Sequence, residues 1–243
     1  MKITPIKTPI VHAGDDMLQL IKQAVPSLPE KSILVITSKV VALWENNVRP
    51  TDIDKHDLVR QEAEYYTEPS QSAYDIMLTV KHGILAVNAG IDKSNAGGQY
   101  VLLPDKPYVS AEKIWKFLKQ EYGLNQVGVL ITDSKTFPLK WGTMGTSLAH
   151  CGFKALLDKR GDTDLFGYEM QMTQVNVAEG LAAAAVVEMG EVDEAMPLCV
   201  IEDARQVEFV DHPPTVEEQA MLKIELEADA YAPILTKAEW QQR

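Results

Sequence analysis

Two continuous apolar segments constrain the fold of this chain more than any other feature of its sequence. Residues 32–37 read SILVIT and residues 126–132 read QVGVLIT. Short apolar runs that are bounded by polar residues and rich in β-branched side chains predict buried strands. The chain has 243 residues, of which 46% are hydrophobic, and this is enough to bury them in one large domain or two small ones.

Other patterns place further elements around these strands. Further strands are predicted at 2–11, 83–87 and 197–201, and 133–161 reads as strand and loop because it is rich in glycine and polar residues. Helices are predicted after 14–16 and at 54–66, 111–122, 173–189 and 215–228, with Ser110 as an N-cap. Strands and helices mix without a regular βαβ alternation, which favours an α+β fold. No linker or repeat divides residues 1–243, so we expect a single unit whose subdomain boundaries the sequence leaves open.

The charge and cysteine content exclude several classes of function. A net charge of -12 disfavours nucleic acid and membrane surfaces as partners, although lysines or a metal can still attract a small anion. Cys151 and Cys199 are far apart, which argues against a disulfide framework or a zinc ribbon. No apolar signal core follows Met1, and the longest apolar run, 181–187, is too short to span a bilayer. We therefore expect a soluble, cytoplasmic protein.

The common catalytic motifs are absent from the chain. It contains no GxxxxGK[ST] loop, no GxGxxG after a strand, no GxSxG elbow and no HExxH. The five histidines show no metal-ligand spacing. Any chemistry must therefore use a less common arrangement.

Polar residues follow two of the predicted strands. Residues 88–95 read NAGIDKSN, and Asp133-Ser134 directly follows the strand 126–132. Asp and Asn oxygens suit a hard divalent cation, and lysine suits phosphate. The alternative is an Asx turn in which Asp92 and Asn95 bond their own backbone, or a simple cap after the second strand. Two strand exits that each carry an Asp favour the functional interpretation.

Three further features could contribute to such a site. Glu191, in the acidic loop after the Ala-rich helix, could add an oxygen ligand, although most charge runs are only solvated. Lys39, Lys93 and Lys140 could neutralise phosphate, although each alone fits an ordinary surface lysine. Residues 160–167 (RGDTDLFG) indicate a tight turn with a structural role.

Taken together, these segments resemble one family. The matching pieces are PIVHAGDD (9–16), LVITSKVV (34–41), NAGIDKSN (88–95), GVLITDS (128–134), GTMGTSLAHCGFKALLDKRGDTDLFG (142–167) and NVAEGLAAAAVVEMGE (176–191). Their order and spacing are similar to those of the coenzyme F-420-0:L-glutamate ligases, the γ-glutamyl ligases, over roughly residues 5–205. The resemblance implies an α+β fold of two intertwined subdomains with mixed or antiparallel sheets, and a homodimer.

The resemblance also implies an activity and a set of site residues. Such enzymes join L-glutamate to a carboxylate acceptor with GTP and Mg or Mn, and transfer of the γ-phosphoryl group makes an acyl phosphate that the glutamate amine attacks. Asp92 and Asp133 would bind a first metal, and Ser134 and Glu191 a second. Asp92, Asp133 and Lys140 are the predicted catalytic residues. The predicted nucleotide contacts are Pro9, Ile10 and Val11 (with Thr8), Ser38, Lys39, Asn95, and Met189 and Gly190 at the start of the 189–196 loop.

The chain departs from the family pattern at three places. Leu43 stands where the family often has a lysine that contacts the nucleotide, residues 136–142 replace an FGRPWR.G pattern, and Tyr168 replaces an arginine. These changes resemble the branch proposed to extend folates, so a folate stays open beside coenzyme F-420-0 as the acceptor. A metal-dependent nucleotide phosphohydrolase and a non-catalytic nucleotide-binding homologue are the alternative functions.

Overall fold

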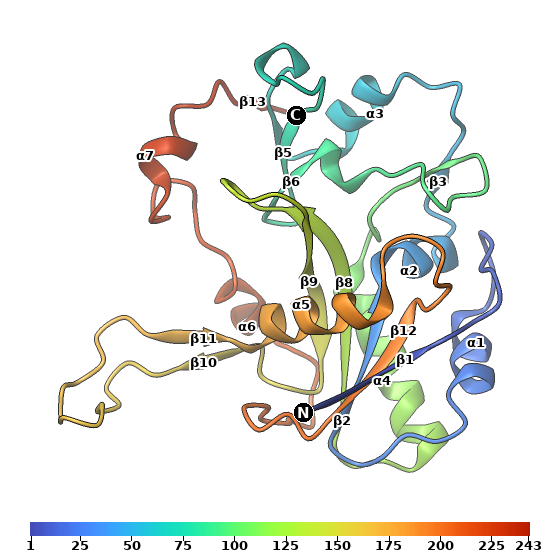
Figure 1. The fold of residues 1–243 in the computed structure, drawn as a ribbon, viewed down its shortest axis with the longest axis vertical. Helices are drawn as coiled ribbons and strands as arrows, with labels where there is room; N and C mark the ends of the chain where they lie inside the picture. Colours follow the sequence, from blue (N-terminus) through green and yellow to red (C-terminus); the bar gives the residue numbers. More distant parts are fainter.

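The computed structural model describes all 243 residues, and its centre is a five-stranded mixed sheet (Figure 1). The strand order is β1 (Lys2–Ile6), β12 (Leu198–Glu202), β2 (Ser32–Thr37), β8 (Val127–Thr136) and β9 (Thr143–Cys151). Only β2 and β8 pair in parallel, and the other neighbours are antiparallel. The two apolar segments are thus adjacent central strands, which confirms that both are buried.

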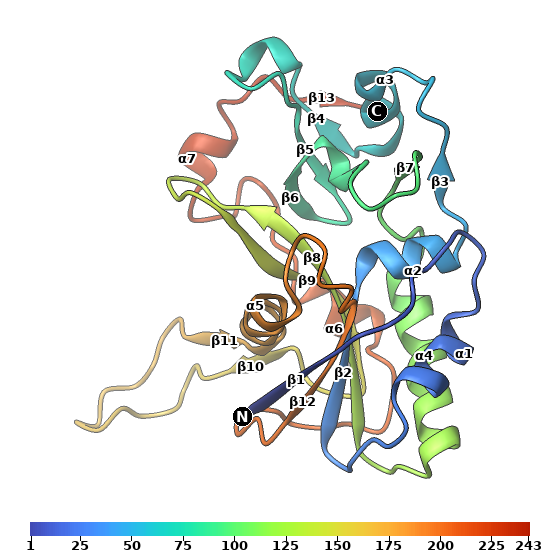
Figure 2. The same ribbon diagram turned by 45° about the vertical axis from the view of Figure 1, so that its right-hand side comes forward.

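Helices cover both faces of this sheet. Figure 2 shows α5 (Val177–Met189) on one face and α1 (Met17–Ala24), α2 (Ser38–Trp44) and α4 (Pro107–Tyr122) on the other. Successive side chains of β8 point to opposite faces, so Val129 and Ile131 enter the core under α4 while Leu130 enters the core under α5. This alternation continues to the end of the strand and decides where the polar residues there point.

A smaller antiparallel sheet lies at one end of the molecule. Its strand order is β13 (Gln241–Gln242), β4 (Tyr65–Tyr66), β5 (Leu78–Lys81) and β6 (Ile84–Val87), and it lies near α3 (Lys55–Glu62) and the strand pair β3 (Val48–Arg49) and β7 (Tyr100–Val101). Mixed and antiparallel sheets without a regular βαβ alternation confirm the α+β class. The boundary between subdomains stays a prediction.

The remaining elements are short. A two-stranded hairpin of β10 (Leu156–Asp158) and β11 (Gln174–Asn176) projects from the body (Figure 1). Single 3-10 turns occupy Pro69–Gln71 and Asn88–Gly90. The C-terminal part of the chain carries α6 (Val216–Ala220) and α7 (Ala232–Leu235) before it ends in β13.

Several predicted elements differ from the structure at their ends. The first strand stops at Ile6, the helix predicted at 54–66 is α3 alone, and the start of the helix predicted at 173–189 is instead β11 (Gln174–Asn176). The helix predicted at 215–228 is wrong beyond Ala220. Ser110 is not an N-cap, because α4 begins at Pro107 and the Ser110 hydroxyl donates to Glu45.

Both cysteines are buried and unpaired, as expected. Cys151 and Cys199 lie in the cores on opposite faces of the sheet, and burial raises the pKa of each thiol to about 12. No helix has the length and apolar content needed to cross a lipid bilayer.

His150, on β9, is a polar residue enclosed in this packing. Its ring centroid lies 5.7 Å from that of Tyr108 and 5.4 Å from that of Phe153, and its buried Nδ1 has no hydrogen-bond partner. Burial lowers the pKa of His150 to about 4, and the nearby charge of Glu218 only partly opposes this. The folded protein therefore keeps His150 neutral.

We predict that His150 makes the fold sensitive to acid. Between pH 6.5, its ordinary pKa, and about pH 4 the unfolded chain takes up a proton that the folded chain does not, so stability falls as pH falls. The substitution His150→Leu should remove up to about 3 kcal/mol of this pH dependence. Urea unfolding at several pH values measures it, with His12→Leu as the control. An unchanged pH slope in His150→Leu would contradict the assignment.

Candidate active site

The candidate site begins where β2 ends beside the middle of β8. The strand predicted to stop at residue 132 continues to Thr136 through its pairing with β9, so Asp133 and Ser134 lie within β8 and do not follow it. Their parallel register pairs Thr37 with Thr132, so the next residues on each strand, Ser38 and Asp133, are also neighbours. The Ser38 hydroxyl donates to Asp133 Oδ1 at 2.8 Å. Ser38 opens α2, whose second residue, Lys39, faces the same region. Two of the predicted nucleotide contacts thus adjoin a predicted metal ligand.

A strained turn presents the second carboxylate. Asn88, Ala89 and Gly90 all have positive φ, and a Cβ on Gly90 would lie 2.6 Å from the Leu103 side chain. Hydrogen bonds hold the turn in this conformation: the Asn88 side chain accepts from the Met77 N–H, and Thr79 Oγ1 accepts from the Ala89 N–H. Strained backbone of this kind persists only where the surroundings fix it, and it concentrates at functional sites.

Asp92 follows this turn and is fixed by several donors. Two backbone hydrogen bonds with Val101 anchor it, at 2.8 and 3.0 Å. Its carboxylate accepts from Lys39 Nζ at 2.7 Å and from the Ser94 hydroxyl at 2.5 Å. Burial alone would raise the pKa of Asp92, but the hydrogen bonds from Lys39 and Ser94 outweigh it and hold the pKa at about 2. Asp92 is therefore ionised at neutral pH.

Asp133 has weaker compensation for its charge. Burial raises its pKa, the Ser38 hydrogen bond and the charge of Lys39 lower it, and the charge of Asp92 raises it further. The net shift is upward. Lys39 therefore stands near both carboxylates but bonds only Asp92, which leaves the negative charge on Asp133 costly.

The acidic loop after α5 closes the site on a third side. Gly190 has φ of +80°, and a Cβ there would lie 2.2 Å from Glu194, so the turn requires glycine. Ser134 Oγ donates to Glu191 Oε1 at 2.8 Å, and the Asn95 amide donates to the Val192 carbonyl at 2.7 Å. The Thr8 N–H donates to the Ala195 carbonyl, which brings 8–11 to the same loop.

The structure therefore brings most of the predicted site residues together. The hydrogen-bonded group contains Ser38, Lys39, Asp92, Asn95, Asp133, Ser134 and Glu191, with Pro9, Ile10 and Val11 beside the 189–196 loop. Met189 is buried in the core under α5, so only its backbone and Gly190 reach the loop. Ile10 is 80% exposed and free to contact a ligand.

Lys140 is the predicted site residue that lies apart. It sits in the turn between β8 and β9, whose tip extends away from α2 and the loop after α5 in both ribbon views (Figures 1 and 2). Its backbone N–H bonds the Phe137 carbonyl, and its side chain forms no ion pair. The chain thus does not bring Lys140 to the carboxylates.

Leu43, the first departure from the family pattern, is a core residue in this structure. Leu43 is 5% exposed and packs with Ala42, Ala96 and Val101, so this position serves the core. Lys39 stands four residues earlier on α2, on the same side of the helix. It supplies a cation to the carboxylates from one turn away.

The donor set fits a divalent cation only in part. Carboxylate and hydroxyl oxygens suit Mg or Mn, and the insufficiently compensated charge of Asp133 would favour a cation. No group of three or more His, Cys, Asp or Glu side chains is arranged to hold a metal by itself. Substrate oxygens would have to complete the coordination, as is common where Mg binds with phosphates.

Lys135, Thr146 and Glu179 lie beside the cluster but were not among the predicted site residues. Lys135 lies two residues after Asp133, on the same face of β8, and burial lowers the pKa of its ammonium while Glu179 and Asp133 oppose this. Thr146 pairs with Asp133 across β8 and β9, and its hydroxyl donates to the Glu179 carboxylate. The period of two along a strand was the available signal for Lys135.

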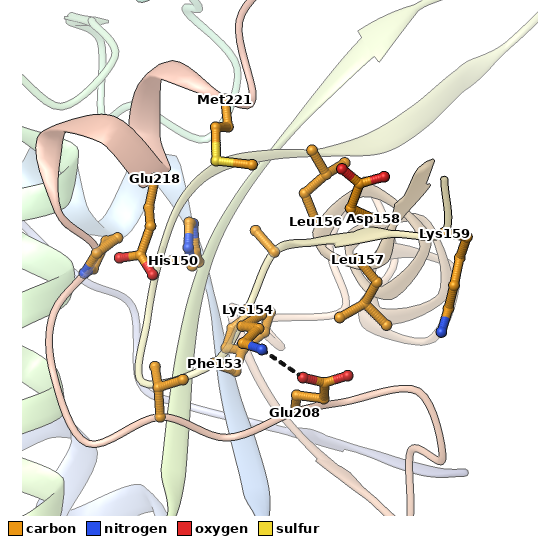
Figure 3. A pocket seen from close by; sticks show the side chains of 13 residues that line it. His150, Phe153, Lys154, Leu156, Leu157, Asp158, Lys159, Glu208, Glu218 and Met221 are labelled. Atoms are coloured by element: carbon orange, nitrogen blue, oxygen red, sulfur yellow. Dashed lines mark hydrogen bonds and ion pairs between the residues drawn. The ribbon is translucent and has the colours of Figure 1, made fainter. Parts of the chain in front are cut away.

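Two cavities lie outside this cluster. One, of about 340 Å³, is lined by His150, Lys154, Glu208, Glu218 and Met221, among others (Figure 3). Figure 3 shows Lys154 and Glu208 joined across one side, with His150 and Glu218 on another. The second, of about 290 Å³, runs beside β9 and includes Glu179. Of the two cavities, only the second is connected to the cluster: its lining residue Glu179 accepts a hydrogen bond from Thr146, which pairs with Asp133.

Comparison with known proteins identifies the family to which the chain is similar. The sequence model of the family described as F420-0:Gamma-glutamyl ligase matches residues 5–203. The chain is similar to proteins named coenzyme F420:L-glutamate ligase: it is 32% identical over 222 residues to one from Methanococcus maripaludis strain C7 (84% of this chain, 88% of that protein) and 31% identical over 226 residues to one from Halobacterium salinarum strain R1 (84% and 86%). It is 41% identical over 129 residues to one from Methanocaldococcus jannaschii (53% and 51%).

This α+β protein thus has relatives that match it over most of its length. The chain belongs to the F420-0:γ-glutamyl ligase family. The recognition made from the quoted motifs is therefore confirmed.

We predict that Lys39 sets the protonation of Asp92. In Lys39→Met the pKa of Asp92 should rise from about 2 toward its ordinary 3.8 or beyond, because burial would then be opposed by Ser94 alone. Carboxyl-carbon NMR during an acid titration measures this. Lys93→Met is the matched control, because only the backbone N–H of Lys93 bonds Asp92. A pKa that stays near 2 in Lys39→Met would refute the role of Lys39.

Proposed function

We propose that this protein is a GTP- and divalent-metal-dependent γ-glutamyl ligase that forms an amide between L-glutamate and a carboxylate acceptor. The observation that carries the proposal is that four distant segments meet: those of Lys39, Asp92 and Asp133, and the loop 189–196. The names of the family and of its relatives support ligase chemistry over simple nucleotide hydrolysis.

The chemistry needs two linked steps, because a carboxylate is a poor electrophile. An acceptor carboxylate oxygen attacks the γ-phosphorus of GTP, the bond to the β-phosphate oxygen breaks, and GDP leaves with an acyl phosphate behind. The glutamate amine then attacks the acyl carbon, the bond to the phosphate oxygen breaks, and the nitrogen gives up a proton. The products are an amide, inorganic phosphate and GDP. This chemistry requires positioning and charge neutralisation rather than a protein nucleophile.

The residues of the cluster fit these needs. Lys39 offers an ammonium beside the carboxylates, and Ser38 holds Asp133 in place. Asn95 and Thr8 tie the loop 189–196 to the turn and to the N-terminal segment, so a nucleotide between them would contact all three. Asp92, Asp133, Ser134 and Glu191 would hold the cations. When bound, divalent cations neutralise the phosphate charge that this acidic chain would otherwise repel.

The acceptor is a small molecule with a carboxylate, either coenzyme F-420-0 or a folate. The relatives' names favour the first, and the departures at 136–142 and Tyr168 favour the second. Both acceptors should therefore be tested in the same assay.

The central test is whether nucleotide turnover requires both glutamate and acceptor. Purified protein with GTP, Mn and each acceptor should release phosphate only when L-glutamate and the acceptor are both present, and mass spectrometry should find the added glutamate. Chelation by EDTA should stop turnover. Phosphate release without either substrate would instead identify a phosphohydrolase, and no turnover with retained GTP binding would identify a non-catalytic homologue.

We predict that Asp133→Asn lowers kcat by at least ~1000-fold, because the site loses a charge that it needs in the transition state. The melting temperature should not fall, since the amide oxygen can still accept from Ser38 and a costly buried charge is removed. Differential scanning calorimetry separates the two effects. Full activity in Asp133→Asn would remove Asp133 from the mechanism.

We further propose that the active form is a homodimer. The hairpin of β10 and β11 carries Leu165 (99% exposed), Phe166 (94%) and Met172 (87%), and the turn after β8 exposes Trp141 (95%). Asp164 fixes the hairpin tip, since its carboxylate accepts from the N–H groups of Phe166 and Tyr168. An ordered hairpin that presents large apolar side chains to solvent is typical of a surface that docks onto a partner.

Phe166→Asp should therefore convert a dimer into a monomer, because a carboxylate would be buried unpaired in the interface. Light scattering coupled to size exclusion measures the mass. Ile234→Asp, at an exposed apolar position on α7, is the control and should stay dimeric. A wild-type protein that is monomeric at micromolar concentration would refute the proposal.

A further inference from the structure

The cavity beside β9 lies where several elements meet. Strand β9 is the edge of the main sheet, and the cavity of about 290 Å³ runs along it from the start of α5 to the start of α4. The turn between β5 and β6 and the end of α6 complete the wall. Its polar lining groups are His82, Lys106, Ser147, Asn176, Glu179, Gln219 and Lys223.

The cations of this cavity are not neutralised within the protein. Lys106 and Lys223 both line it, and neither forms an ion pair, although the chain has a net charge of -12. The aliphatic part of Lys223 lies on Gly83, so close that an added Cβ would be 3.0 Å from Cδ, which holds its ammonium near the cavity. Burial lowers the pKa of His82, so the two lysines are the positive charges.

Backbone donors add to these cations. Lys106 caps α4 with no side-chain hydrogen bond, and the N–H groups of Tyr108 and Val109, which line the cavity, have no acceptor in the protein. Free N–H groups and a lysine at the start of a 16-residue helix favour a carboxylate.

One negative group stands at the opposite side, next to the candidate active site. Glu179 belongs to the first turn of α5, and its carboxylate accepts from Thr146 at 2.9 and 3.1 Å. Thr146 is the residue that pairs with Asp133 across the sheet, and Ser147, the next residue, lines the cavity. Ser147 pairs with Thr132, so the cavity adjoins the sheet one residue before Asp133, the predicted catalytic residue.

We propose that this cavity binds the amino-acid substrate, an α-amino dicarboxylate, with its amino group toward Glu179 and its carboxylates toward Lys106 and Lys223. The two carboxylates and the one ammonium of such a substrate are equal in number and opposite in charge to the two lysines and the one glutamate of the cavity. The amine would then face the side of the cavity that adjoins Asp133, where the acyl phosphate forms. This assignment rests on the proposed ligase function and names the substrate site for its second step.

The wall that carries Lys223 lies outside the family match. Gln219, Leu222 and Lys223 follow residue 203, where the similarity to the family ends, so this side of the cavity belongs to the C-terminal segment of the chain. The end of this segment is anchored because β13 pairs with β4 in the smaller sheet. Binding of the amino acid would thus depend on residues that the family pattern does not include.

The test is a comparison of Michaelis constants in Lys106→Met, Lys223→Met and the double variant. Each single variant should raise KM for L-glutamate by ~10-fold or more, since a charge-assisted bond to a carboxylate is lost. KM for GTP and for the acceptor should stay within ~2-fold, and Lys223→Arg should recover most of the loss. Lys237→Met, a lysine of the same C-terminal segment without an ion pair, is the matched control.

Binding measured without turnover separates this proposal from the ligase function. Calorimetry should detect L-glutamate binding to the wild type and at least ~10-fold weaker binding to the double variant. The wild type should prefer L-glutamate to glutarate, which lacks the amine, and Glu179→Gln should lose that preference.

The outcomes that overturn the proposal are distinct. A ligase whose KM for L-glutamate is unchanged in the double variant refutes the site but keeps the function. A rise in KM for the acceptor alone assigns the cavity to the acceptor and refutes the proposal as stated. If the wild type neither ligates nor binds L-glutamate, the function and this site both fail.

Discussion

The parallel pairing of β2 with β8 is the constraint on which the rest of the site depends. Its register places Ser38, at the end of β2, beside Asp133 within β8, and the antiparallel pairing of β12 with β2 brings the loop 189–196 to the same edge. A slip of one residue would turn Asp133 toward α5 and Ser134 toward α2, which would exchange their partners. The apolar side chains of β2 and β8 fix this register by filling both cores, so packing far from the site determines its geometry.

The charge balance at this edge explains how an acidic chain can handle a polyphosphate. Lys39 bonds Asp92 and also lies near Asp133, whose pKa is raised by burial and by the charge of Asp92. One lysine cannot neutralise two carboxylates, and in the proposed function the remaining charge attracts the cations that accompany the nucleotide. Leu43 contributes only to the core here, while Lys39, four residues earlier on α2, donates to Asp92.

How far the sequence predicts this structure depends on the range of the interactions involved. The central strands, the Asp92 turn and Asp133 could be found because each is encoded within about ten residues. Helix α2 could not, because Val40 and Val41 favour a strand and only packing under the sheet makes the segment helical. The helix predicted at 215–228 fails for the opposite reason, because its local signal is strong but its packing is weak. Thr215 and Glu218 form a capping box, yet no residue of α6 is buried and the helix ends at Ala220. Contacts such as Asn95 with Val192 join distant loops, and no local pattern encodes them.

The C-terminal segment connects these observations to specificity. After residue 203 it passes along the main sheet, where the Lys154 N–H bonds the Glu208 carbonyl, and it ends as β13 in the smaller sheet. It thereby forms walls of both cavities without altering the register of β2, β8 or β9. A chain built this way can change which substrates fit beside β9 through residues 204–243 alone, while the cluster at Asp133 stays fixed by the buried strands. Phosphoryl transfer and substrate choice would then depend on different parts of the sequence.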